Sequence, residues 1–155
     1  MEEEILDTKD ISEEYKATVL YGELSDTIPE TAGVYIIVLE EKKAIGRLLG
    51  ADNERIMYIG KTVNKKGLIK RLRKFYYCAT TNKKGKNVPV DGHSGGRRYF
   101  LTSMEELGDA RKVLNFLYVK CDKKEAEKKE SELLNEYVSK FGEVPPLNSQ
   151  LPRKI

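Results

Sequence analysis

The sequence has little of what secreted and membrane proteins depend on, because it contains two cysteines, one histidine and no long hydrophobic run. Cys78 and Cys121 do not make a disulfide framework and lack metal-knuckle spacing, so we expect two reduced, partly buried thiols. No stretch approaches the roughly 18–20 apolar residues of a membrane span. Residues 2–4 are glutamates, where a secretory signal would be basic. These absences predict a cytoplasmic protein with no membrane partner.

Charge is distributed very unevenly along the chain. The 155 residues suit one domain with a single core, and 34% of them are charged, yet the net charge is only +3. Residues 1–30 hold ten acidic residues against two basic ones, whereas residues 61–98 hold twelve basic residues against one acidic. A concentrated basic block inside a domain is the electrostatic footprint of a protein that binds polyanions. We therefore expect a nucleic-acid partner.

Apolar runs and turn residues predict a small α+β domain over residues 28–155, preceded by an acidic extension over residues 1–27 with a short helix near 11–16. Residues 79–96 are expected to form a long polar loop. The order of elements predicts a three-stranded, mainly antiparallel sheet flanked by helices. The strands are expected at 34–39, 55–60 and 112–119, the main helices at 68–77 and 123–141, and a short helix within 97–110.

Glu130 is placed unlike a surface charge. On the expected helix 123–141 it lies four residues after Ala126 and three and four residues before Leu133 and Leu134, so it shares their apolar face. Burying a charge without a partner costs several kcal/mol. This carboxylate therefore needs either a divalent cation or an internal arginine or lysine, and the pattern leaves both alternatives open.

Other candidate residues are ambiguous when each is taken alone. Tyr35 and Tyr58 lie on expected strands, where aromatic residues often serve packing only. Arg71 is one of many bases, although its planar guanidinium suits two phosphate oxygens at once. Arg73 lies about 200° around the helix from Arg71, so both cannot enter one site. His93 lies in a glycine-rich segment suited to a phosphate, but a lone loop histidine is more often inert.

Taken in order, these residues resemble the motif set of the GIY-YIG nuclease superfamily. The resemblance covers roughly residues 28–149, and it is carried by Gly33-Val34-Tyr35, Tyr58-Ile59-Gly60-Lys61-Thr62, Arg71, Glu130-Ser131-Glu132-Leu133-Leu134 and Asn148. It implies the GIY-YIG-like fold and a metal-dependent endonuclease that hydrolyses DNA phosphodiester bonds. It also implies that Glu130 binds Mg²⁺, with Mn²⁺ as an alternative.

The resemblance further implies roles at the site. Tyr35 and Tyr58 would edge it, one of them positioning or deprotonating the attacking water. Arg71 would stabilise the added negative charge, and Asn148 would tie the C-terminal segment to the site. Family members carry His or Tyr about one turn after the arginine, where this chain has Phe75 followed by Tyr76. The general base is therefore open among Tyr35, Tyr58, Tyr76 and His93. The expected substrate-binding residues are Gly60, Lys61, Lys70, Arg73, Lys74 and Arg97.

Lys61 is expected to contact the phosphate or to lower the pKa of a tyrosine, and Gly60 to leave room for the phosphate. We expect DNA as the partner, with branched, double-stranded and single-stranded forms open, and a monomer or homodimer. The basic block alone supports a second hypothesis equally well, a non-catalytic nucleic-acid-binding module on the same fold. Magnesium separates the two, because cleavage needs it and simple binding does not.

Overall fold

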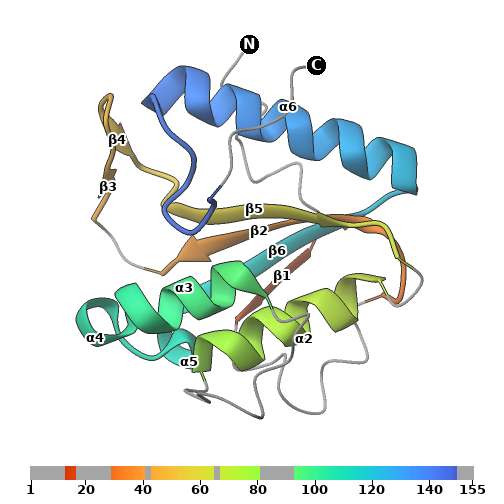
Figure 1. Ribbon diagram of the computed structural model, residues 1–155, viewed down its shortest axis with the longest axis horizontal. Helices are drawn as coiled ribbons and strands as arrows, with labels where there is room; N and C mark the ends of the chain where they lie inside the picture. The colour runs from red at the N-terminus through yellow and green to blue at the C-terminus, as the bar shows by residue number, and fades with distance from the viewer. Residues whose placement is uncertain (1–12, 17–28, 41–42, 65–66, 81–92, 150–155) are drawn as a thin grey trace.

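A four-stranded antiparallel sheet, in the strand order β1-β6-β2-β5, forms the centre of the structure (Figure 1). The computed structural model describes residues 13–16, 29–40, 43–64, 67–80 and 93–149. A small hairpin of two further strands lies in the connection between β2 and β5. The strands are β1 (Glu13–Lys16), β2 (Gly33–Leu39), β3 (Ile45–Gly46), β4 (Ala51–Asp52), β5 (Ile56–Thr62) and β6 (Leu114–Lys120).

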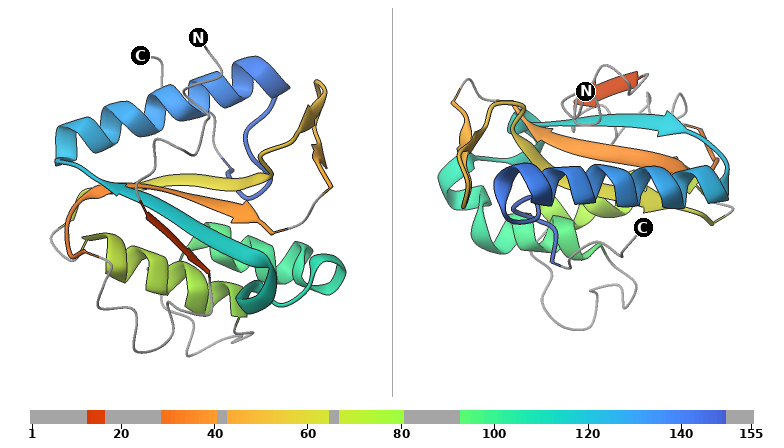
Figure 2. Two further views of the ribbon diagram at one scale, coloured as in Figure 1. Left: turned by 180° about the vertical axis from the view of Figure 1, so that it is seen from behind. Right: turned by 90° about the horizontal axis from the view of Figure 1, so that it is seen from above.

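Helices cover both faces of this sheet, as Figures 1 and 2 show. One face is covered by α2 (Gly67–Thr80), α3 (Ser94–Thr102), α4 (Met104–Leu107) and α5 (Ala110–Val113), and the other by α6 (Lys123–Phe141). The result is a three-layer α+β domain. The α+β fold class expected from the sequence is confirmed.

Side chains of β2 alternate between two apolar clusters, which explains why this strand is apolar almost throughout. Tyr35 and Ile37 pack in the cluster with α2 and α3, whereas Val34 and Ile36 pack in the cluster with α6. All four side chains are at most 1% exposed. The strand expected at 34–39 is therefore present, and it is buried on both faces.

The N-terminal extension contributes a strand, and the prediction of a helix near 11–16 was wrong. Glu13 pairs with Tyr118 and Tyr15 with Phe116, which makes β1 the edge strand beside β6. A single helical turn fixes several residues for one hydrogen bond, whereas an edge strand gains a ladder of bonds along its neighbour. The sheet consequently has four strands instead of the expected three. The rest of the extension lies outside the described residues.

Helix α6 has the bounds expected from its periodicity. The Asp122 carboxylate accepts a hydrogen bond from the Glu125 amide (2.8 Å) at the start, and Gly142 ends the helix with a left-handed φ of 78°. The loop expected over 79–96 was wrong at both ends, because α2 continues to Thr80 and α3 begins at Ser94. The helix expected within 97–110 consists of the three short helices α3, α4 and α5. Residues 81–92 lie outside the described residues.

The free edge of β5 is covered by the segment that follows α6. The Leu147 amide donates to the Met57 carbonyl (2.9 Å). The Asn148 side chain then bonds both backbone groups of Ile59, accepting from its N–H (3.0 Å) and donating to its carbonyl (2.9 Å). Arg98 holds this segment by donating to the carbonyls of Leu147 and Asn148. Backbone groups of Met57 and Ile59 at this edge of the sheet therefore have hydrogen-bond partners within the chain.

The helices within the described residues include none that is both long enough and apolar enough to cross a membrane.

Candidate active site

Tyr35 and Tyr58 lie side by side on the face of the sheet that α2 and α3 cover. Antiparallel pairing sets Tyr35 opposite Gly60 and Tyr58 opposite Ile37, so the two tyrosines point to the same face. Their rings stack with centroids 5.9 Å apart and an interplanar angle of 25°. Tyr35 is fully buried and Tyr58 is half-buried. The first two sequence motifs therefore meet in space as one pair of phenols.

Gly60 lies directly beneath this pair. A Cβ atom there would stand 2.6 Å from the Tyr35 hydroxyl oxygen and 2.6 Å from the Tyr58 ring. Real Cβ atoms do not approach other atoms this closely, so any side chain would force the rings apart. The structure therefore gives a packing reason for this glycine, in addition to the room for phosphate that the sequence suggested.

Arg71 on α2 lies close enough to both phenols to act on the pKa of each. Burial raises the pKa of Tyr35 well above its ordinary value, the nearby Tyr58 raises it further, and the positive charge of Arg71 opposes both effects. Burial also raises the pKa of Tyr58, again opposed by Arg71. Both phenols are consequently protonated at neutral pH. The guanidinium is half-buried and turned toward them, whereas Arg73 is exposed, as their angular separation on the helix predicted.

His93 is buried within the same group and does not lie in a surface loop. Its Nε2 atom lies 2.7 Å from the Tyr35 hydroxyl, and its Nδ1 accepts from the amides of Gly95 (3.1 Å) and Gly96 (3.4 Å). The imidazole also meets Tyr58 edge-on, at 4.9 Å between ring centroids. Burial, together with the charges of Arg71 and Lys74, lowers the pKa of His93 to about 3. The imidazole is therefore neutral across the physiological range.

Glu130 finds an internal partner, the ammonium group of Lys61, at 2.9 Å. The two side chains are 19% and 32% exposed, so the pair is shielded but reachable by water. Lys61 follows Gly60 on β5, so alternation turns it to the opposite face of the sheet, where α6 packs. The carboxylate still raises the pKa of Tyr58, after burial and against Arg71. Glu130 therefore influences the pKa of Tyr58 from the other side of strand β5.

A divalent cation at this point would meet one carboxylate. The residues that the structure describes include no group of three His, Cys, Asp or Glu placed to bind an ion. The amide oxygen of Asn148 already accepts from Ile59. One carboxylate nevertheless fits Mg²⁺, which keeps several waters and commonly takes one or two carboxylates plus substrate phosphates. The Lys61 ammonium lies 2.9 Å from Oε1 of Glu130. A cation bound by Glu130 would therefore have to share the carboxylate with Lys61 or displace it.

The other expected substrate-binding residues surround this group on α2 and α3. Arg73 and Arg97 are exposed, while Lys70 and Lys74 are half-buried. Lys74 is close enough to His93 to lower its pKa. Helix α2 contains four bases and no acid. The remaining bases of the block, apart from Arg98, lie outside the described residues: Lys65, Lys66, Lys83, Lys84 and Lys86.

Sequence patterns did not single out Gly95, Phe75 or Arg98 as part of the site. A Cβ atom at Gly95 would stand 2.8 Å from the Tyr58 ring, so this glycine lets the start of α3 reach the phenols. Phe75 packs edge-on against His93, at 5.0 Å between ring centroids. Tyr76, a candidate base, is buried in the core instead. The sequence did carry one signal for this part of the site. Gly95 and Gly96 follow soon after the only histidine, and two adjacent glycines permit close packing of a helix.

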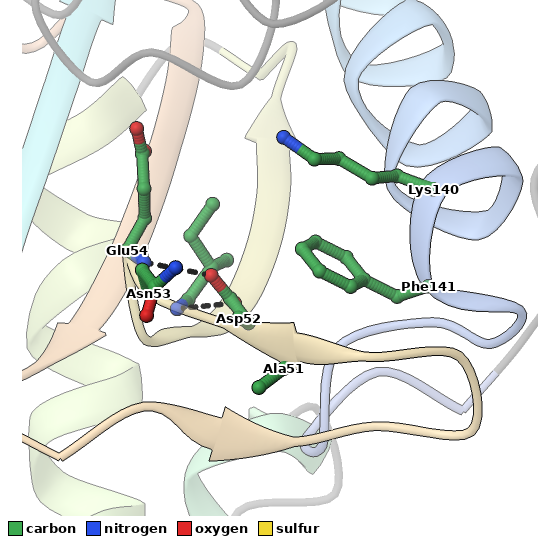
Figure 3. A pocket seen from close by; sticks show the side chains of 7 residues that line it. Ala51, Asp52, Asn53, Glu54, Lys140 and Phe141 are labelled. Carbon is green, nitrogen blue, oxygen red and sulfur yellow. Dashed lines mark hydrogen bonds between the residues drawn. The ribbon is translucent and has the colours of Figure 1, made fainter.

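A separate pocket lies beside Asp52, near the start of β5 (Figure 3). The Asp52 carboxylate accepts hydrogen bonds from the backbone amides of Glu54, Arg55 and Ile56 and from the Tyr137 hydroxyl (2.9 Å). These bonds occupy both of its oxygens and tie the turn before β5 to α6. We therefore assign Asp52 a structural role, apart from the phenol group.

Comparisons with protein-family models, with curated proteins and with solved structures found no match. The resemblance to the GIY-YIG superfamily stays a prediction, and any function must be inferred from the geometry of the site.

Proposed function

We propose that this chain is a metal-dependent endonuclease of the GIY-YIG type that hydrolyses phosphodiester bonds in DNA. The observation that carries this proposal is the stacked pair of Tyr35 and Tyr58 with Arg71 beside both phenols and the Glu130 carboxylate close enough to act on Tyr58. Attack on a phosphodiester needs a proton acceptor for water and positive charge for the phosphoryl oxygens. The group supplies both beside α2, which holds four bases and no acid.

Arg71 would bind the phosphate. Its guanidinium donates in a fixed fork that matches two phosphoryl oxygens, and it is half-buried, so its charge is less screened than that of an exposed arginine. Such a donor stabilises the charge that develops on the pentacoordinate phosphorus. Lys70, Arg73 and Lys74 on the same helix would hold the neighbouring backbone phosphates.

Tyr58 would accept the proton of the attacking water. It is half-buried where Tyr35 is fully buried, it stacks on Tyr35, and the charge of Arg71 acts on its pKa. Because burial raises the pKa of Tyr58, the reactive phenolate is a minor form at neutral pH. The rate of hydrolysis is therefore expected to rise with pH through the neutral range.

Glu130 would hold the metal. A Mg²⁺ ion held there would polarise the phosphate and stabilise the leaving oxygen. Lys61 balances the charge of Glu130 in the free protein, and it would be available to contact phosphate if a metal engaged the carboxylate.

The test compares cleavage of supercoiled, linear, branched and single-stranded DNA with Mg²⁺, with Mn²⁺ and with a chelator. Glu130→Gln is expected to lose cleavage on the order of 10²–10³-fold, because several kcal/mol of charge stabilisation depend on the metal. Glu127→Gln is the matched control, since Glu127 is an exposed glutamate on the same helix. Cleavage by Glu130→Gln at the wild-type rate would overturn the metal role.

The alternative is a nucleic-acid-binding module without cleavage, and one observation favours it. Lys61 already satisfies Glu130, so the carboxylate has a partner with no metal at all. DNA binding that is indifferent to Mg²⁺, with no cleavage of any substrate form, would establish this alternative in place of the nuclease.

A further inference from the structure

We propose that His93 is a positioning residue that sets the direction of the hydrogen bonds in the tyrosine pair, so that Tyr58 presents its proton to the open side of the site. The consequence for catalysis depends on the proposed function. The hydrogen-bond direction itself does not, and it is tested separately below.

The start of α3 fixes the tautomer of His93. The amides of Gly95 and Gly96 both donate to Nδ1, so this nitrogen carries a lone pair and no hydrogen. A neutral imidazole has one donor nitrogen and one acceptor nitrogen. The hydrogen must therefore lie on Nε2, the atom 2.7 Å from the Tyr35 hydroxyl.

This tautomer determines where Tyr35 sends its own hydrogen. The Tyr35 oxygen accepts from His93 Nε2, and the nearby Arg71 guanidinium has no acceptor to offer. Tyr35 is fully buried, so its hydrogen needs a partner within the protein. The phenol stacked on Tyr35 is Tyr58, at 5.9 Å between ring centroids, so we infer that Tyr35 donates to Tyr58.

The direction of this chain favours Tyr58 as the proton acceptor in hydrolysis. With Tyr35 donating toward its oxygen and Arg71 offering only donors beside it, Tyr58 would turn its own hydrogen away from both. The opposite tautomer of His93 would reverse the order, with Tyr35 donating to His93 and Tyr58 donating inward to Tyr35.

The packing around His93 holds its imidazole in position against the two tyrosines. Gly95 brings the start of α3 against the Tyr58 ring, where a Cβ atom would stand 2.8 Å away. Phe75 holds the imidazole edge-on from α2. The charged groups that act on this cluster are Arg71 and Lys74 from α2 and Glu130 from α6, with Lys61 of β5 paired to Glu130.

The direct test is nitrogen-15 NMR of the imidazole ring, which is unambiguous because His93 is the only histidine. We expect a hydrogen on Nε2, none on Nδ1, and no change from about pH 8 to about pH 5, well below the ordinary histidine pKa of about 6.5. A hydrogen on Nδ1, or protonation near the ordinary pKa, would overturn the proposal whatever the protein does to DNA.

Two substitutions separate the functions of the two ring nitrogens. Asparagine in His93→Asn is a strong helix N-cap that can replace Nδ1, but it is too short to reach Tyr35. Glutamine in His93→Gln can place an N–H near the former Nε2, but it gives up the cap. We expect kcat for DNA cleavage to fall about 10–100-fold in His93→Asn at nearly constant KM. His93→Gln should recover most of that loss although it is less stable.

Equal kcat in His93→Asn and the wild type would contradict the positioning role, and so would a kcat loss in both variants that merely follows their stability. If the wild type cuts no DNA, the proposed function fails and the catalytic consequence fails with it. The NMR result then still decides the direction of the hydrogen bonds.

Discussion

At the scale of single residues, the site depends on positions that lack a side chain as much as on those that carry one. Gly60 and Gly95 each leave the space in which a tyrosine ring lies. His93 and Arg71 then take up the polar atoms of the two phenols. A change at any of these positions is therefore expected to affect the phenol pair first.

Gly60→Ala is expected to destabilise the protein by about 1–3 kcal/mol, because the new Cβ overlaps the side chains of Tyr35 and Tyr58 and forces them to shift. Gly46→Ala is the control, since a Cβ there meets no atom within 4 Å. Urea unfolding of both variants measures the difference. A Gly60→Ala midpoint equal to that of Gly46→Ala would show that the rings are not packed as described.

His93 is expected to make the free energy of unfolding depend on pH. Its pKa is about 3 in the folded protein and about 6.5 when unfolded, so between these values the unfolded chain binds a proton that the native protein does not. The contribution of neutral His93 to the free energy of unfolding is fully present above about pH 6.5. It falls by up to about 1.4 kcal/mol per pH unit as the pH decreases toward 3. Urea unfolding across this range should show a steeper loss for the wild type than for His93→Asn. Parallel curves would contradict a buried neutral imidazole.

At the scale of elements, long apolar patterns were predictable and short segments were not. Strands β2, β5 and β6 and helix α6 followed from runs and periodicity that are local in the sequence. Strand β1 was missed because four residues gain their structure from pairing with β6, about 100 residues away. The start of α3 was missed because its cap is a histidine, which is not among the usual N-cap residues.

The candidate site was predictable to a similar degree. The inward face of Glu130 followed from helix periodicity, but its partner Lys61 lies 69 positions away on another strand, so both alternatives stayed open. That Tyr35 and Tyr58 edge one site was implied by the resemblance, and the antiparallel pairing of β2 with β5 brings the two rings together. The hydrogen bond between His93 and Tyr35 depends on the tertiary packing of α3, which no local pattern contains.

The segment after α6 is expected to control the geometry of β5. Asn148→Ala removes two hydrogen bonds to the Ile59 backbone and should cost about 1–3 kcal/mol. Cleavage should fall as well, because Tyr58 neighbours Ile59. Ser149→Ala, at an exposed position next in the chain, is the control. Unfolding and cleavage measured on both variants test this, and equal values for the two would rule the edge contact out.

At the scale of the whole molecule, charge is segregated between the two helical layers. Helix α2 holds four bases and no acid, whereas α6 holds five bases and five acids. The face covered by α2 and α3 is therefore the one expected to meet DNA. This face is also the one that carries the phenol pair.

Binding of DNA, measured in a chelator so that no cleavage occurs, should weaken steeply with salt. Arg73→Gln is expected to lower the slope of log K against log salt by about 1, because one phosphate contact is lost. Lys123→Gln removes the same charge from an exposed position on α6 and should leave the slope unchanged. Equal slopes for the two variants would place the DNA on another face.

The rate of single-turnover DNA cleavage in Mg²⁺, compared between wild type and Tyr58→Phe over a range of pH, tests the central claim most directly. The wild-type rate should rise up to about tenfold per pH unit through the neutral range, since the pKa of Tyr58 lies above its ordinary value. Tyr58→Phe should be slower by about 10²–10⁴-fold, while Tyr77→Phe on α2 matches the wild type. Cleavage by Tyr58→Phe at the wild-type rate, or no cleavage by any of the three, would contradict a phosphodiesterase site built on this tyrosine.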